Sequence, residues 1–253
     1  MSAGGALVPL PGAATLPPSA QAELRAALAR LRGGGMLVRG ARALARLAAV
    51  PVMRGLLGRS GAGAALEAMA RAALERAFGI AVLGLPDSGA ARRLLVSPHL
   101  AHVATALSGA ASGAVGLLGA VPDAALTTLL IMRQIAAVAL EQGEDLRDEA
   151  TRRACLEVFA LDSAGAEGGY WGARLLLRGA PVAAVLAQAT RSWSVGLADK
   201  LAAQAAPVAG AAGGALVNTA FLRHYRGLAR GHFTIRRLER DYGAAAVRAA
   251  AAD

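Results

Sequence analysis

The sequence is poor in cysteine, aromatic residues and lysine. Cys155 is the only cysteine, so no disulfide can form within the chain, and a reducing compartment such as the cytoplasm is expected. Aromatic residues make up only 4% of the chain, so the core must be built mainly from Leu, Val and Ala. That composition favours tightly packed helices over a sheet, because strands are enriched in β-branched and aromatic residues. Lys200 is the only lysine among 27 basic residues, which indicates the coding bias of a GC-rich genome.

Acidic residues are scarce at both ends of the chain. The first hundred residues hold 12 arginines against 4 acids, and residues 201–253 hold 7 against 3, within a formal net charge of +10. Basic ends indicate an anionic partner, for which we predict membrane lipid. Nucleic acid is the alternative. It is disfavoured because uncharged glycine-rich segments have no role in binding it, and neither a helix-turn-helix nor an aromatic stacking pattern is visible.

No segment alternates with period two for long enough to indicate a strand, whereas apolar residues recur at helical spacing. We therefore predict an all-α protein, a compact multi-helix bundle with a basic amphipathic C-terminal helix. Residues 1–18 contain four prolines and no basic signal-peptide region, so we expect a disordered leader there. A single helical domain over 19–247 and a tail over 248–253 complete the predicted organisation. Helices are expected near 19–32, 36–49, 64–78, 124–140, 149–159, 170–177 and 181–201.

An acidic cluster precedes the helix expected at 149–159. A solvated turn with Asp148 as the N-cap explains it, and a cation site or a basic partner are the alternatives. Its members are Glu141, Glu144, Asp145, Asp148 and Glu149.

Two uncharged stretches, 103–121 and 201–222, are rich in small residues and contain nearly the same hexapeptide. Each contains two glycines four residues apart, which lie on one helix face and permit close contact between helices. At 1.5 Å per residue, the first stretch would be roughly 28 Å long, near the bilayer core of about 30 Å. Ala, Gly and Ser contribute little transfer energy, so we favour core helices packed face to face over membrane insertion. The predicted helix-contact glycines are Gly109, Gly113, Gly210 and Gly214.

The C-terminal segment is strongly amphipathic. Phe221, Leu228, Ile235 and Tyr242 recur every seven residues and define an apolar stripe. Arginines occupy the opposite side and form a predicted lipid-binding face. They are Arg223, Arg226, Arg230 and Arg237.

Two polar residues, His232 and Glu239, fall inside the apolar stripe. Buried polar groups require partners, so we predict a structural pair within a hydrogen-bond network. The alternative is an enzyme acting on a lipid or peptide, with these two as acid and base. No phosphate-binding loop or nucleophile elbow occurs. Cys155, on the apolar side of its helix, is expected to be buried and inert. We predict no catalytic residues, no metal site and no cofactor.

Several blocks in fixed order resemble the EcsC family over roughly residues 36–243. The clearest is Ala229–Gly243, which follows the glycine-rich segment Gly210–Phe221 with Asn218 in its expected place. Further similar segments are Ser108–Gly119, Pro122 with Leu126–Thr128, Gln142–Leu146, Cys155–Leu161 and Gly169–Arg174.

The resemblance implies a helical, membrane-related accessory protein more than an enzyme. The family is named for the third product of an operon whose other two products form an ABC transporter, and it supplies no catalytic residues to transfer. We therefore expect a non-enzymatic cytoplasmic protein, peripheral to the inner membrane, with anionic lipid and an ABC transporter as partners.

Overall fold

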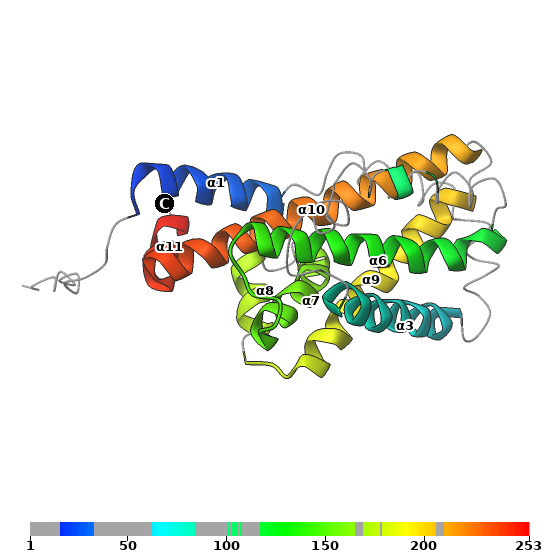
Figure 1. Ribbon diagram of the computed structural model, residues 1–253, viewed down its shortest axis with the longest axis horizontal. Coiled ribbons are helices and arrows are strands. Elements are labelled where there is room, and N and C mark those ends of the chain that lie inside the picture. Colours follow the sequence, from blue (N-terminus) through cyan, green and yellow to red (C-terminus); the bar gives the residue numbers. More distant parts are fainter. Residues whose placement is uncertain are drawn as a thin grey trace, which may run out of the picture.

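The computed structural model describes residues 16–32, 62–83, 101, 103–105, 107, 117–164, 169–177, 179–205 and 210–252. All regular elements within these ranges are helices, which confirms the predicted all-α bundle (Figure 1). They are α1 (Pro18–Arg32), α3 (Ala62–Leu83), α6 (Leu117–Glu141), α7 (Glu149–Ala164), α8 (Gly169–Leu177), α9 (Val182–Ala205), α10 (Gly210–Tyr242) and α11 (Ala244–Ala252).

The long helix α10 organises the bundle. It runs along the longest axis of the molecule and packs against α1, α6, α7, α9 and α11 (Figure 1). Most of its predicted apolar stripe is buried, including Phe221, Leu228 and Ile235, whereas Tyr242 at its end is 37% exposed. Burial along one side of α10 from Asn218 to Leu238 explains how a single helix can join the end of the glycine-rich segment to the basic one.

The few aromatic residues gather at the centre of the core. Phe159 of α7 packs on Tyr225 of α10, with ring centroids 4.9 Å apart, and Trp193 of α9 lies 5.3 Å from Tyr225. The indole Nε1 of Trp193 donates a hydrogen bond to Thr128 Oγ1 of α6 at 3.0 Å. The small side chains predicted for the core therefore surround an aromatic centre that joins four helices.

Helices extend past both ends of the predicted domain, whose leader lies outside the described residues up to residue 15. Helix α1 begins at Pro18, and Leu16, assigned to the leader, is only 3% exposed. Residues 248–252, assigned to a tail, belong to α11, which packs on α1 and α10 through buried Val247. Gly243, with φ of 85°, reverses the chain between α10 and α11, and the alanine-rich sequence then favours a helix.

The second uncharged stretch, 201–222, is not one helix. Its first residues end α9 and the residues from Gly210 onward begin α10. Helix α6 begins at Leu117, seven residues before the predicted start, so the end of the first stretch is also helical. Four other predictions lie outside the described residues: Gly109, Gly113, the helix 36–49 and the surroundings of Gly210 and Gly214.

The described parts of the two uncharged stretches meet at Asn218 of α10, which is fully buried. Its amide Nδ2 donates to the carbonyl oxygen of Thr105 at 3.1 Å and to Asp123 Oδ1 of α6 at 2.8 Å. The observed junction between the stretches is thus a polar one.

A close glycine contact occurs at Gly231, between α10 and α1. A Cβ atom added there would lie 2.8 Å from the backbone oxygen of Ala27 and 2.7 Å from Cγ of Leu31. The small residue that permits close approach thus lies within the basic amphipathic segment.

Among the described residues, one segment, Asp123–Glu141 of α6, is long and apolar enough to cross a membrane. Two thirds of it is buried inside the bundle, as in the core helix of a globular protein.

Candidate functional site

Three helices, α7, α8 and α10, enclose a polar cluster around His232. His232 is fully buried, and its Nδ1 lies 3.2 Å from the hydroxyl of Tyr170 on α8. Burial, reinforced by the positive charges of Arg174 and Arg236, lowers the pKa of His232 well below its usual value, so the ring is neutral. Burial also raises the pKa of Tyr170, which keeps its proton and can donate it to Nδ1.

Glu239 is held by Arg174, a residue of the same helix α8 that contains Tyr170. Arg174 lies one turn after Tyr170 and donates to Glu239 Oε2 at 2.7 Å, while its guanidinium lies 5.7 Å from the centre of the Tyr170 ring. His232 and Glu239, two turns apart on α10, therefore each contact a residue of α8. The described contacts do not join the two residues directly to each other.

Glu157 of α7 closes the other side of the cluster. Its Oε2 lies 3.6 Å from Nε2 of His232, and its Oε1 lies 3.2 Å from Nε of Arg153. Burial raises the pKa of Glu157, although the nearby arginines oppose this shift. The carboxylate thus lies in a poorly solvated position beside a neutral histidine.

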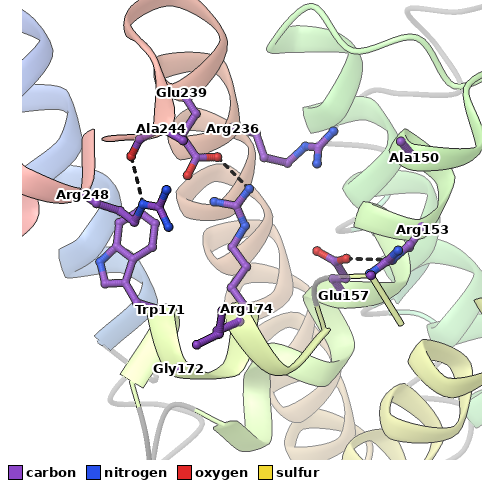
Figure 2. Close-up of a pocket in the computed structure, with 12 residues that line it drawn as sticks. Ala150, Arg153, Glu157, Trp171, Gly172, Arg174, Arg236, Glu239, Ala244 and Arg248 are labelled. Carbon is purple, nitrogen blue, oxygen red and sulfur yellow. Dashed lines mark hydrogen bonds and ion pairs between the residues drawn. The ribbon is translucent and has the colours of Figure 1, made fainter. Parts of the chain in front are cut away.

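A cavity of about 490 Å³ lies beside this cluster, between α7, α8, α10 and α11 (Figure 2). Four arginines and two glutamates line it, together with an apolar wall that includes Trp171 and Leu175. The charged residues are Arg153, Arg174, Arg236, Arg248, Glu157 and Glu239. His232 is absent from the lining, so it is not placed to touch a molecule in the cavity. Among the described residues, no group of three His, Cys, Asp or Glu side chains is placed to hold a metal ion.

The acidic cluster is only partly a solvated turn. Asp145, Asp148 and Glu149 are exposed, as predicted, but the Glu144 side chain is only 5% exposed. Arg236 donates two hydrogen bonds of 2.9 Å to it, and Thr151 donates a third, also of 2.9 Å. Burial opposes ionisation of Glu144, but the bonds from Arg236 outweigh it and lower the pKa. Arg236 of the same chain therefore pairs with the buried acid of this cluster.

Three of the four arginines in the predicted lipid-binding face contact acids of neighbouring helices. Arg226 pairs with Glu141 of α6 at 3.2 Å and also contacts Gln134, and Arg230 lies 3.8 Å from Glu141. Arg237 pairs with Glu23 of α1. Arg223 is exposed and makes no ion pair with a described residue. The face thus joins α10 to α6 and α1 along much of its length.

Cys155 is buried, as predicted. Burial raises the pKa of its thiol to about 12, so the thiolate required of a nucleophile is strongly disfavoured.

Tyr170, Arg174 and Glu157 were not predicted as site residues from the sequence. The spacing of Tyr170 and Arg174, and of Arg153 and Glu157, places each pair on one helix face, which was a visible signal. That these faces meet around His232 depends on how α7, α8 and α10 pack.

The fold and site define an all-helical protein with a buried histidine cluster beside an arginine-lined cavity. A family model described as the EcsC protein family matches residues 95–238, more than half of the chain. The chain therefore belongs to the EcsC family. The match includes Arg153, Glu157, Arg174 and Arg236, whereas α1 and α11 lie outside it. No curated protein and no solved structure matches the chain.

Acid is expected to destabilise the protein through His232. The folded-state pKa lies well below 6.5, so below this pH the unfolded chain binds a proton that the folded chain does not. Linkage then predicts a loss of up to about 1.4 kcal/mol in unfolding free energy per pH unit, beginning as the pH falls through 6.5. Urea unfolding of the parent and of His232→Gln, at about pH 7 and about pH 5.5, measures the difference. His232→Gln should have the shallower pH dependence.

Tyr170→Phe is the matched control for this prediction. It removes the hydrogen bond but retains the buried ring, and burial is the main cause of the lowered pKa. This variant should keep the pH dependence of the parent. If His232→Gln and the parent show equal pH dependence of stability, His232 is not the cause of the acid sensitivity.

Proposed function

We propose that this protein is a membrane-associated accessory protein that binds the bilayer surface peripherally through one uncharged end of its bundle. The observation that carries the proposal is a group of exposed large apolar side chains at that end. Exposed apolar patches on folded proteins mark sites that contact other proteins or membranes.

The exposed residues surround the buried Asn218 junction. Leu216 lies two residues before Asn218, Leu126 lies three residues after Asp123, and Val103 and Leu107 flank Thr105. These four side chains are between 41% and 68% exposed. The polar junction thus holds three helical segments together, and their apolar neighbours face outward.

The segments that meet at this junction contain almost no charge. Residues 101–122 and 201–222 contain no charged residue, and Asp123 is buried against Asn218. In Figure 1 the beginnings of α6 and α10 and the end of α9 lie together at the right-hand end. Low charge reduces the desolvation cost of entering the boundary between headgroups and acyl chains, and each leucine that leaves water contributes up to about 1.5–3 kcal/mol.

Arg223 supports anionic lipid as the partner. It is the first charged residue after the uncharged start of α10 and it is exposed. An arginine near an anionic leaflet contributes about 1 kcal/mol. The other predicted lipid-facing arginines already pair with acids, so the proposal relies on the apolar end and Arg223.

The proposed accessory role is supported by membership of the EcsC family. The EcsC resemblance links this protein to an ABC transporter, and peripheral binding at the inner membrane would bring it to the place where such a transporter lies. The enzymatic alternative based on His232 and Glu239 has less support, since His232 does not line the cavity and Glu239 is paired with Arg174.

Flotation with liposomes tests the proposal. The parent protein should float with vesicles of phosphatidylcholine and phosphatidylglycerol, and the triple variant Leu107→Gln/Leu126→Gln/Leu216→Gln should lose most of this binding. The variant Leu176→Gln is the control, because this leucine is 84% exposed on α8, outside the cavity lining and away from the uncharged end. All three proteins should keep the same helical circular dichroism, since the replaced side chains are exposed.

Arg223→Gln should reduce binding to anionic vesicles more than binding to vesicles of phosphatidylcholine alone. A parent protein that does not float, or triple and control variants that float equally, would refute the proposed surface.

A further inference from the structure

The cavity beside the histidine cluster has the chemistry of an anion site. Four guanidinium groups face it from α7, α8, α10 and α11, against two carboxylates (Figure 2). Both carboxylates are already paired with arginines, Glu157 with Arg153 and Glu239 with Arg174. The lining therefore has an excess of positive charge and of hydrogen-bond donors.

Some of these donors have no acceptor. Nη1 of Arg174 is buried and has no hydrogen-bond partner, although Nη2 of the same group binds Glu239. Arg248 on α11 donates only to the carbonyl oxygen of Ala244 in its own helix, and it makes no ion pair with any residue that the structure describes. Buried donors without acceptors are uncommon in folded proteins, and guanidinium groups match the oxygens of phosphate in geometry and charge.

The shape of the cavity adds a second requirement. A volume of about 490 Å³ is within the range of small-molecule sites, and it exceeds what a single inorganic ion fills. Trp171 and Leu175 provide an apolar wall beside the arginines, and Figure 2 shows the Trp171 ring next to Arg248. A ligand that fits both parts carries a phosphate group and a small organic group.

We propose that this cavity binds a phosphate ester, with its phosphate held by Arg248 and Arg174 and its organic group against Trp171. The site does not depend on membrane binding, because α8 and α11 lie toward the end of the long axis opposite the uncharged surface (Figure 1). The phosphate could belong to a soluble metabolite or to a lipid headgroup, and the two sources are separated below by experiment.

Isothermal titration calorimetry of the full chain tests the site, with inorganic phosphate and glycerol 3-phosphate as probes and sodium chloride compensating the ionic strength. The parent should bind one equivalent of each. Arg248→Gln should weaken binding about tenfold or more, as expected for losing a charge-assisted hydrogen bond. Arg191→Gln is the control, since Arg191 is an exposed arginine of α9 outside the cavity.

A second variant fills the cavity without removing charge. Gly172 lines the cavity, and a Cβ added there would meet no atom within 4 Å. The Cβ of Gly172→Leu therefore fits without a clash, and the variant should weaken glycerol 3-phosphate binding about tenfold or more while its circular dichroism matches that of the parent. A parent that binds neither probe would overturn the proposal. Arg248→Gln and Gly172→Leu variants that both bind as tightly as Arg191→Gln would overturn it as well.

Vesicles of phosphatidylcholine with phosphatidic acid separate the two sources when all proteins carry the Leu107→Gln/Leu126→Gln/Leu216→Gln changes, which remove binding through the uncharged end. If Arg248→Gln and Gly172→Leu lose vesicle binding as well as glycerol 3-phosphate, the phosphate is that of a lipid headgroup. If they lose only glycerol 3-phosphate, the ligand is soluble. The Leu107/Leu126/Leu216 triple variant should still bind phosphate, so failure of the membrane surface and failure of the cavity are distinguishable.

Discussion

Replacing Glu144 with alanine is expected to lower the free energy of unfolding by about 3 kcal/mol, because it removes the shared acceptor of a partly buried charge network. Arg236 donates two bonds to this carboxylate, and Thr151 and Arg240 also contact it. Without it, the Arg236 guanidinium, 23% exposed, would remain beside Arg174 with much of its hydration removed. Chemical denaturation at neutral pH measures the loss.

Glu149→Ala is the matched control for Glu144. It removes an acid from the same cluster, but Glu149 is exposed in the first turn of α7, where its interaction with the helix dipole contributes at most about 1 kcal/mol. Equal losses for the two variants would mean that the buried hydrogen bonds of Glu144 contribute no more to stability than its negative charge does.

The pKa of Glu144 is lowered in the folded state. Its contribution is therefore complete above pH 4.5 and disappears as the pH falls through the folded-state pKa.

Gly231→Ala is expected to destabilise the protein by about 1–3 kcal/mol through overpacking between α10 and α1. The new Cβ would lie 2.8 Å from the backbone oxygen of Ala27, and a backbone atom cannot rotate away as a side chain can. Helix α1 would have to move away from α10, which would also disturb the packing of buried Leu24 and Leu28. Thermal unfolding followed by circular dichroism measures the effect.

The same substitution one turn earlier should have the opposite sign. A Cβ at Gly227 would meet no atom within 4 Å, so Gly227→Ala should gain the helix propensity of alanine, up to about 1 kcal/mol. Two alanine variants four residues apart on one helix then differ only in what the added methyl group meets. If both raise the melting temperature, α1 does not approach α10 as closely as the structure has it.

Much of the fold follows from local sequence. The apolar stripe of α10 follows from the regular spacing of its apolar residues. Its burial at Phe221, Leu228 and Ile235 agrees with the prediction. Helix α7 begins directly after Asp148, as its N-cap role predicts. Cys155 is buried, as its position on an apolar helix face predicts. The packing of Leu16 and of α11 does not follow from local sequence, because it depends on contacts with distant segments.

The candidate site was predicted only in part. His232 and Glu239 stood out because polar residues interrupted an apolar stripe, which is a signal within one helix. Their partners Tyr170 and Arg174 lie more than sixty residues earlier, and nothing in the local pattern of α8 indicates which helix it faces. The arginines of the predicted lipid-binding face all have the same local signature, yet Arg237 pairs with Glu23 of α1 while Arg223 is exposed.

By itself, the sequence determined the helical class, the amphipathic character of α10 and the family, because periodicity, composition and ordered motifs are properties of the chain. The tertiary structure alone decided which charges pair, which glycine permits close approach and where a cavity remains. The physical reason is that ion pairing, steric contact and cavity formation depend on distances between segments far apart in sequence. Those distances are set by the simultaneous packing of all the helices around α10.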